Sequence, residues 1–211
     1  YKDSCLRDSL EAFMSIVLQI PSFQIEKRQK LENASFCFID ILFTNHIAIP
    51  SQMASEGFIN LVRFVVLGID SFDAETVAKC ADCIDQLATY FYLNRNRDTA
   101  TVRSLQLIVN ANASLWNDLF EKILNALLFN KKSEEALSRP IHSIYLIDSG
   151  VAEHYYSAIA ATQPADVVVK LKDSMMRLTQ DLDVTLEPIL RDQFCEKCKE
   201  FRNEVLSYLV L

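Results

Sequence analysis

The sequence predicts an all-helical fold in which antiparallel helix pairs are stacked along the chain. Half of the 211 residues are hydrophobic, yet only three are Gly and five are Pro, which leaves little material for the tight turns of sandwiches and barrels. Apolar residues recur at offsets of three and four along most of the chain, as on one face of an α-helix. Several segments are apolar around most of their circumference and must be covered on two sides.

The first half of the chain contains four predicted helices. A helix opened by Asp3 and ended before Pro21 carries its apolar residues on one face, and residues 36–43 form a helix whose only charge is Asp40. Residues 53–69 form a second inner helix, in which the apolar run from Phe58 to Leu67 is interrupted by a single charge, Arg63. After a turn at 70–73, a helix to Leu93 places one apolar row against one polar row.

The second half continues the pattern after the polar linker 94–98. A shorter helix reaches about residue 109, a second break follows at 110–114, and Ser114 is expected to cap the next helix. Ser133 opens another helix, which contains Pro140 and closes at 148–150. Three further helices are expected at about 151–162, 165–182 and 188–209.

Helix pairs recur every 40–50 residues or so, close to the period of about 40–47 residues in HEAT and armadillo repeats. We therefore expect a HEAT/armadillo-like solenoid, with a compact helical bundle as the alternative. Residues 1–211 are interpreted as one region of a longer protein, and a subdivision near 94–98 is left open.

The charge balance limits the classes of partner. A net charge of -7 and a pI near 5.0 argue against nucleic acid, because phosphate binding needs clustered Lys and Arg. Basic protein surfaces fit better. The longest uncharged run, 41–55, is interrupted by Asn45, His46 and Pro50, so we expect a soluble protein without membrane insertion.

Neither a catalytic site nor a cofactor site is expected. The pairs Cys80/Cys83 and Cys195/Cys198 could offer four thiolates to zinc, but the pairs are far apart and each lies within an apolar helical pattern, so packing is the favoured interpretation. The three histidines, His46, His142 and His154, form no ligand pair. With three glycines, the chain contains neither a nucleophile elbow nor a phosphate-binding loop.

Several strings, in order along the chain, resemble the C-terminal region of nuclear transport receptors of the importin-beta superfamily, most closely the exportin-7 (Ran-binding exportin) branch. They are 17–21 (VLQIP), 38–42 (FIDIL), 80–87 (CADCIDQL), 137–140 (LSRP), 191–194 (RDQF) and 201–205 (FRNEV). The ending 208–211 (YLVL) is equally similar to the sister exportin-4 branch.

The resemblance implies a receptor that binds protein cargo together with the GTPase Ran in its GTP form, contacts nucleoporins and shuttles between nucleus and cytoplasm. It also implies that the main Ran site lies in N-terminal repeats outside this chain, so the isolated segment should bind Ran weakly. The alternatives are a generic HEAT-repeat scaffold of another complex and, more remotely, a zinc- or redox-active cysteine module.

One candidate protein-binding site follows from the polar row of the helix after residue 73. Glu75, Asp82 and Asp85 are expected on its solvent side, where they would meet basic surfaces of a partner. Two small basic spots are interpreted as solvated loop charge; they are Arg95 with Arg97 and Lys131 with Lys132.

Overall fold

A computed structural model describes residues 4–21, 24–25, 28–130, 133–180, 182 and 185–209. All regular structure within these ranges is helical, which confirms the predicted all-α class of HEAT-like helix pairs. The chain divides into two compact units, residues 1–113 and 114–211, at the second of the two breaks in the sequence pattern. Residues 95–99, which contain most of the polar linker, join two helices within the first unit.

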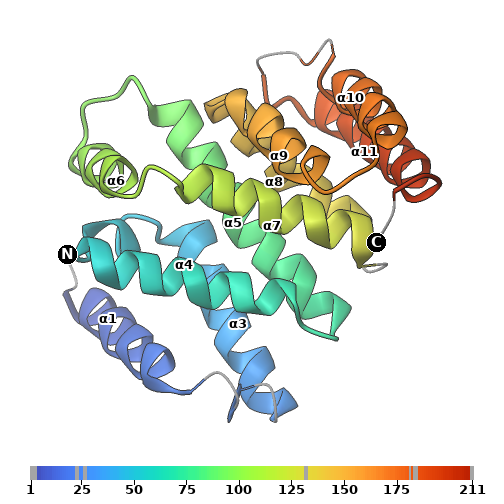
Figure 1. The fold of residues 1–211 in the computed structure, drawn as a ribbon. Coiled ribbons are helices and arrows are strands. Elements are labelled where there is room, and N and C mark those ends of the chain that lie inside the picture. The colour runs from blue at the N-terminus through green and yellow to red at the C-terminus, as the bar shows by residue number, and fades with distance from the viewer. Residues whose placement is uncertain are drawn as a thin grey trace. The chain divides into compact units, whose positions relative to one another are not determined.

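The first unit is built around one central helix, α5 (Figure 1). Its elements are α1 (Ser4–Gln19), α3 (Gln29–Asn45), the short 3-10 helix η1 (Pro50–Gln52), α4 (Ser55–Ile69), α5 (Ala74–Asn94) and α6 (Ala100–Ala111). The helix α5 packs against both α3 and α4, while α6 contacts η1. Side chains that are fully buried between these helices form the core of the unit; they include Ile39, Leu42, Leu61, Ile69, Val77 and Ala81.

The contact between α4 and α5 depends on Gly68. A Cβ atom at this position would lie 2.3 Å from the Sγ atom of Cys80 in α5 and 2.7 Å from the ring of Phe36 in α3. Both distances are far below van der Waals contact. The three helices can therefore meet closely only because residue 68 has no side chain.

The second unit contains the remaining helices (Figure 1). They are α7 (Leu115–Phe129), α8 (Glu134–Ile147), α9 (Gly150–Ala160), α10 (Ala165–Thr179) and α11 (Pro188–Leu206). The helix α8 packs between α7 and α11, and α10 lies beside α11. The core is rich in leucine because α7 buries most of its surface, including Ile123, Leu124, Leu127 and Leu128.

Most helix ends follow the predicted boundaries closely, but α3 begins at Gln29, well before the predicted segment 36–43, and two helix ends are capped differently from the expectation. Ser114 precedes α7 as expected, but its hydroxyl donates to the Oδ2 atom of Asp118 at 2.9 Å and makes no capping bond to the backbone. Ser133 precedes α8 in a left-handed conformation (φ 58°), also without a capping bond. Asp3, the predicted start of the first helix, lies outside the described residues.

Within the described ranges, every helix falls short of the length and apolarity that a bilayer crossing requires.

Candidate functional site

The acidic row predicted on α5 is split between the surface and the interior. Glu75 is exposed, and its Oε1 atom lies 2.6 Å from the Nζ atom of Lys79. Asp82 is half-buried. Asp85 is only 4% exposed, and the Thr89 hydroxyl donates to its Oδ1 atom at 3.4 Å. The expectation that Asp85 lies on a solvated row is therefore wrong.

Helix geometry explains the burial of Asp85. Because α5 packs against two neighbours, its buried arc covers two adjacent rows. Three residues along an α-helix turn the side chain by roughly 60° from its starting direction. That rotation carries position 85 from the direction of Asp82 to the edge of the buried arc. The buried residues of α5 are Thr76, Val77, Cys80, Ala81, Cys83, Ile84, Asp85, Leu87, Ala88 and Tyr92.

A basic residue also neutralises part of this face. The Lys79 ammonium group donates to Glu75 and, at 3.1 Å, to the Sγ atom of Cys37 in α3. The hydrogen bond to Glu75, followed by that to Cys37, raises the pKa of Lys79, so its positive charge is retained. The negative charge of Glu75 is therefore partly neutralised by Lys79 on the same helix, which weakens the attraction of Glu75 for a basic partner.

A cavity of about 780 Å³ lies near the N-terminal end of α5, within the first unit. It is bordered by α3, by the end of α4 and by the turn that joins α4 to α5. The rings of Phe36 and Phe64, with centroids 5.0 Å apart, are both buried at its apolar side. The described residues that line it are Ile25, Gln29, Glu32, Phe36, Phe64, Leu67, Gly68, Asp70, Ser71, Phe72 and Asp73.

Side-chain hydrogen bonds fix the turn at 70–73 against α3. The Ser71 hydroxyl donates to the Oε1 atom of Glu32 at 2.6 Å and accepts from the Asp73 N–H at 3.1 Å. The Asp73 carboxylate caps α5 by accepting from the side chain and the backbone N–H of Thr76, both at 2.9 Å. These bonds lower the pKa of Asp73, and the hydrogen bond from the Thr76 side chain has the largest effect. The turn holds Phe72 with 93% of its surface exposed.

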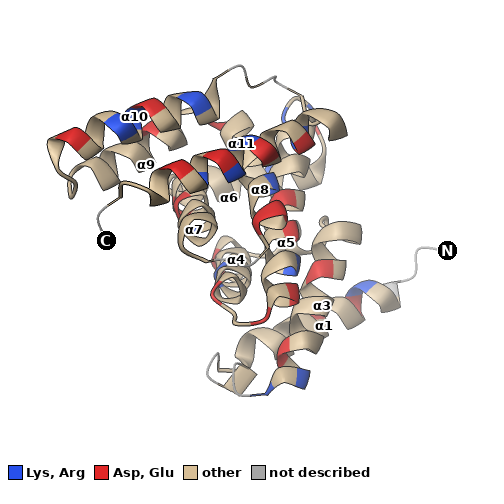
Figure 2. Ribbon diagram, turned by 90° about the vertical axis from the view of Figure 1, so that its right-hand side faces the viewer, with Lys and Arg blue, Asp and Glu red and all other residues tan. Residues whose placement is uncertain are grey.

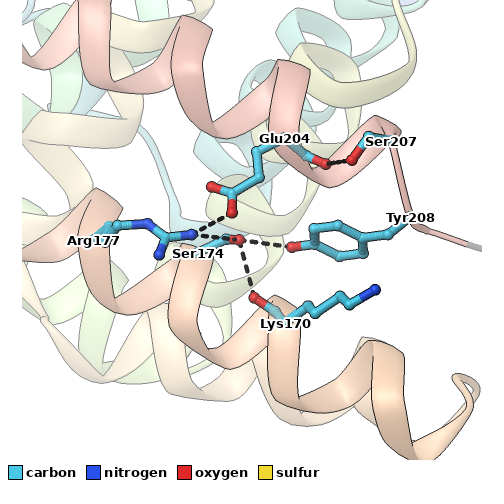
Figure 3. Close-up of polar contacts among 6 residues, drawn as sticks. All are labelled: Lys170, Ser174, Arg177, Glu204, Ser207 and Tyr208. Atoms are coloured by element: carbon cyan, nitrogen blue, oxygen red, sulfur yellow. Dashed lines mark hydrogen bonds and ion pairs between the residues drawn. The ribbon is translucent and has the colours of Figure 1, made fainter.

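A polar network joins α10 to the end of α11 in the second unit (Figure 3). The hydroxyl oxygens of Ser174 and Tyr208 lie 2.7 Å apart, and Ser174 also donates to the Lys170 carbonyl at 2.9 Å. Arg177 pairs with Glu204 across the two helices. Partial burial, as the largest cause, raises the pKa of Tyr208. This network ties the two helices together and offers neither a nucleophile nor an activated base.

The four paired cysteines are buried, as the packing interpretation predicts. Cys80 and Cys83 belong to α5, whereas Cys195 and Cys198 belong to α11. Burial raises the pKa of the Cys80, Cys83 and Cys198 thiols, which keeps these groups protonated and unreactive at neutral pH. Across the described part of the chain, no group of three His, Cys, Asp or Glu residues is arranged to hold a metal ion.

The histidines and the basic spots are scattered. His46 is half-buried, His154 is exposed, and His142 stacks on Phe194 with centroids 4.8 Å apart. Arg95 lies over the ring of Tyr92, with its Cζ atom 3.9 Å from the ring centroid. The predicted spot at 131–132 lies outside the described residues.

Sequence reasoning therefore missed the cavity, because it treated residues 70–73 only as a turn. No local signal could have revealed it, because Glu32 and Ser71 are far apart in the sequence and meet only in the folded chain.

Comparison with curated proteins finds the chain similar to exportins and to a Ran-binding protein. Exportin-7-B of Xenopus laevis is 20% identical over 215 residues, which cover 97% of this chain and 20% of the Xenopus protein. Ran-binding protein 17 of Mus musculus and that of Homo sapiens are each 17% identical over 220 residues, which cover 99% of this chain. The chain spans about a fifth of the length of these relatives.

No family model matches the sequence. No solved structure matches it either.

Proposed function

We propose that this chain is a protein-binding segment of a nuclear transport receptor, drawn from the C-terminal part of a protein of the exportin-7 branch. The observation that carries the proposal is the similarity to exportin-7 and Ran-binding protein 17, which extends over 97–99% of the chain. A match of this extent at low identity is typical of helical repeat proteins, where packing positions are retained and surfaces diverge.

The helix pairs fit this role. Within each unit the helices pack against their neighbours and leave rows of exposed side chains for contact with other molecules. We propose that the chain acts by binding partner proteins. The mechanism is a change in the conformation of the helical stack on binding, and it includes no chemical step. We propose no enzyme activity and no cofactor.

The proposed partners are those of the whole receptor. Protein cargo and Ran in its GTP form would bind to it, with the main Ran contacts outside this segment, and nucleoporins would be met during passage through the pore. The proposed location is accordingly both nucleus and cytoplasm. The name of Ran-binding protein 17 supports the Ran assignment for that relative, and by similarity for the full-length receptor here.

The test compares nucleotide states of Ran. The full-length protein that contains this segment is passed over immobilised Ran loaded with a non-hydrolysable GTP analogue or with GDP. We expect retention by the GTP form alone, and weak or undetectable retention of the isolated 211-residue segment. Equal retention of the full-length protein by both forms would contradict the receptor proposal and favour a scaffold of another complex.

A further inference from the structure

We propose that the cavity between α3 and the α4–α5 turn is a docking groove for a partner segment that presents one apolar side chain flanked by Lys or Arg. This inference rests on the proposed function, since it names the chemistry of a protein that the receptor would hold. It assigns the contact to the groove rather than to the predicted α5 row.

The volume and the lining select an apolar anchor. A space of about 780 Å³ lies within the range of roughly 300–1,000 Å³ typical of ligand pockets. Its apolar side is formed by Phe36, Phe64 and Leu67, and Leu67 is still 44% exposed. An aliphatic or aromatic side chain that entered would cover these surfaces and contribute hydrophobic binding free energy.

The charge at the entrance selects the flanking residues. Glu32, Asp70 and Asp73 line the groove, and its described lining contains neither Lys nor Arg. The bonds from Thr76 hold Asp73 ionised, while Lys79, the cation on the next turn of α5, is engaged by Glu75 and Cys37. Figure 2 shows acidic positions in red along α3 and α5 and at the turn between α4 and α5. Such a negative rim attracts basic segments and repels acidic ones.

The turn between α4 and α5 is already ordered and presents Phe72 to the solvent. The turn is already tied to α3 by the Ser71–Glu32 hydrogen bond and to α5 by the Asp73 cap, so binding would order little additional backbone. Phe72 projects from this fixed turn with 93% of its surface exposed. An aromatic face beside carboxylates suits a Lys or Arg side chain, which can contact the ring and a carboxylate together.

The test begins with a library of random short peptides displayed on phage and selected against the immobilised full chain. We expect the selected peptides to share an apolar residue flanked by Lys or Arg. An enriched peptide is then labelled, and its affinity is measured by fluorescence anisotropy. A selection without basic residues, or with no enrichment at all, would overturn the proposal.

Variants locate the binding. Replacing Glu32 by Gln and Asp70 by Asn keeps the size of both side chains and removes two charges, so the affinity should fall about two- to tenfold, less at high salt. Leu67→Gln, which makes the apolar wall polar, should also weaken binding. The matched control is Glu121→Gln on an exposed position of α7, which should leave the affinity unchanged.

Circular dichroism checks that each variant is folded. Unchanged affinity in folded groove variants would refute the groove, even if the full-length protein still distinguished the two nucleotide states of Ran. Conversely, peptide binding at the groove without a nucleotide preference for Ran would sustain the groove and reject the transport proposal.

Discussion

Replacing Gly68 with Ala should destabilise the first unit. The added Cβ atom would lie 2.3 Å from the Sγ atom of Cys80 and 2.7 Å from the ring of Phe36, where about 3.5–4.0 Å is the comfortable separation for such contacts. Cys80 is 1% exposed and Phe36 is 4% exposed, so neither group can swing into solvent to make room.

The expected magnitude follows from two opposing effects. Overpacking of a filled core costs typically 1–3 kcal/mol, and two short contacts place Gly68→Ala near the upper end. The better helix propensity of Ala offsets at most about 1 kcal/mol. The free energy of unfolding of the first unit, residues 1–113, should thus fall by about 2 kcal/mol, which lowers the melting temperature of that unit by roughly 8 °C.

Urea and thermal unfolding, followed by circular dichroism, measure this change. Gly57→Ala in the same helix is the control, because its Cβ would meet only the flexible end of Met53, at 2.9 Å from Cε, so it should be neutral or slightly stabilising. Adding Cys80→Ala to Gly68→Ala should recover part of the loss, since one of the two contacts disappears. A Gly68→Ala protein as stable as Gly57→Ala would refute the argument that these helices are in contact through a glycine.

Four further predictions follow from burial. Asp85→Lys should lower the free energy of unfolding by about 3 kcal/mol or more, because the lysine ammonium group would be buried. Glu75→Lys should change the free energy of unfolding by about 0.5 kcal/mol or less. Equal urea midpoints for the two variants would contradict the burial of Asp85. Iodoacetamide should alkylate half-buried Cys37 faster than buried Cys80, whose raised pKa keeps it protonated, and peptide mass mapping would report the difference. The raised pKa of the Cys80 thiol also means that the stability of the protein falls as the pH rises above about 8.5, since only the thiol of the unfolded chain then loses its proton. A Cys80→Ala protein should show a flatter decline. Both Arg202→Ala and Arg202→Met remove the hydrogen bond to Glu134, but only Met keeps the packing of this residue, which is 8% exposed. Arg202→Ala should therefore lower the melting temperature more than Arg202→Met. The reverse order would show that charge alone matters at this position.

The helices were predictable because their signals are local. Helix ends lie within a few residues of Pro21, the 70–73 turn, Ser114 and Pro188, although Ser114 makes no capping bond to the backbone. The apolar character of 53–69 likewise predicted an inner helix, and seven residues of α4 are buried.

The candidate site was less predictable because exposure depends on neighbours. The sequence of α5 predicts one apolar row and favours packing of Cys80 and Cys83, but it does not show how wide the buried arc is. The presence of α3 and α4 on two sides of α5 widens the buried arc until it includes Asp85. The groove could not be derived at all, since Glu32 and Ser71 are far apart in sequence and meet only after folding.

The presence of two separate cores in one chain affects how the protein unfolds under force and where proteases cut it. Each unit buries its own set of apolar side chains, so the loss of one core leaves the contacts inside the other intact. A segment pulled from its ends should lengthen in two steps rather than one, and a protease should first cut where the units meet, near Ala113 and Ser114. Such a boundary would confine local unfolding to one unit, which is about half of the chain.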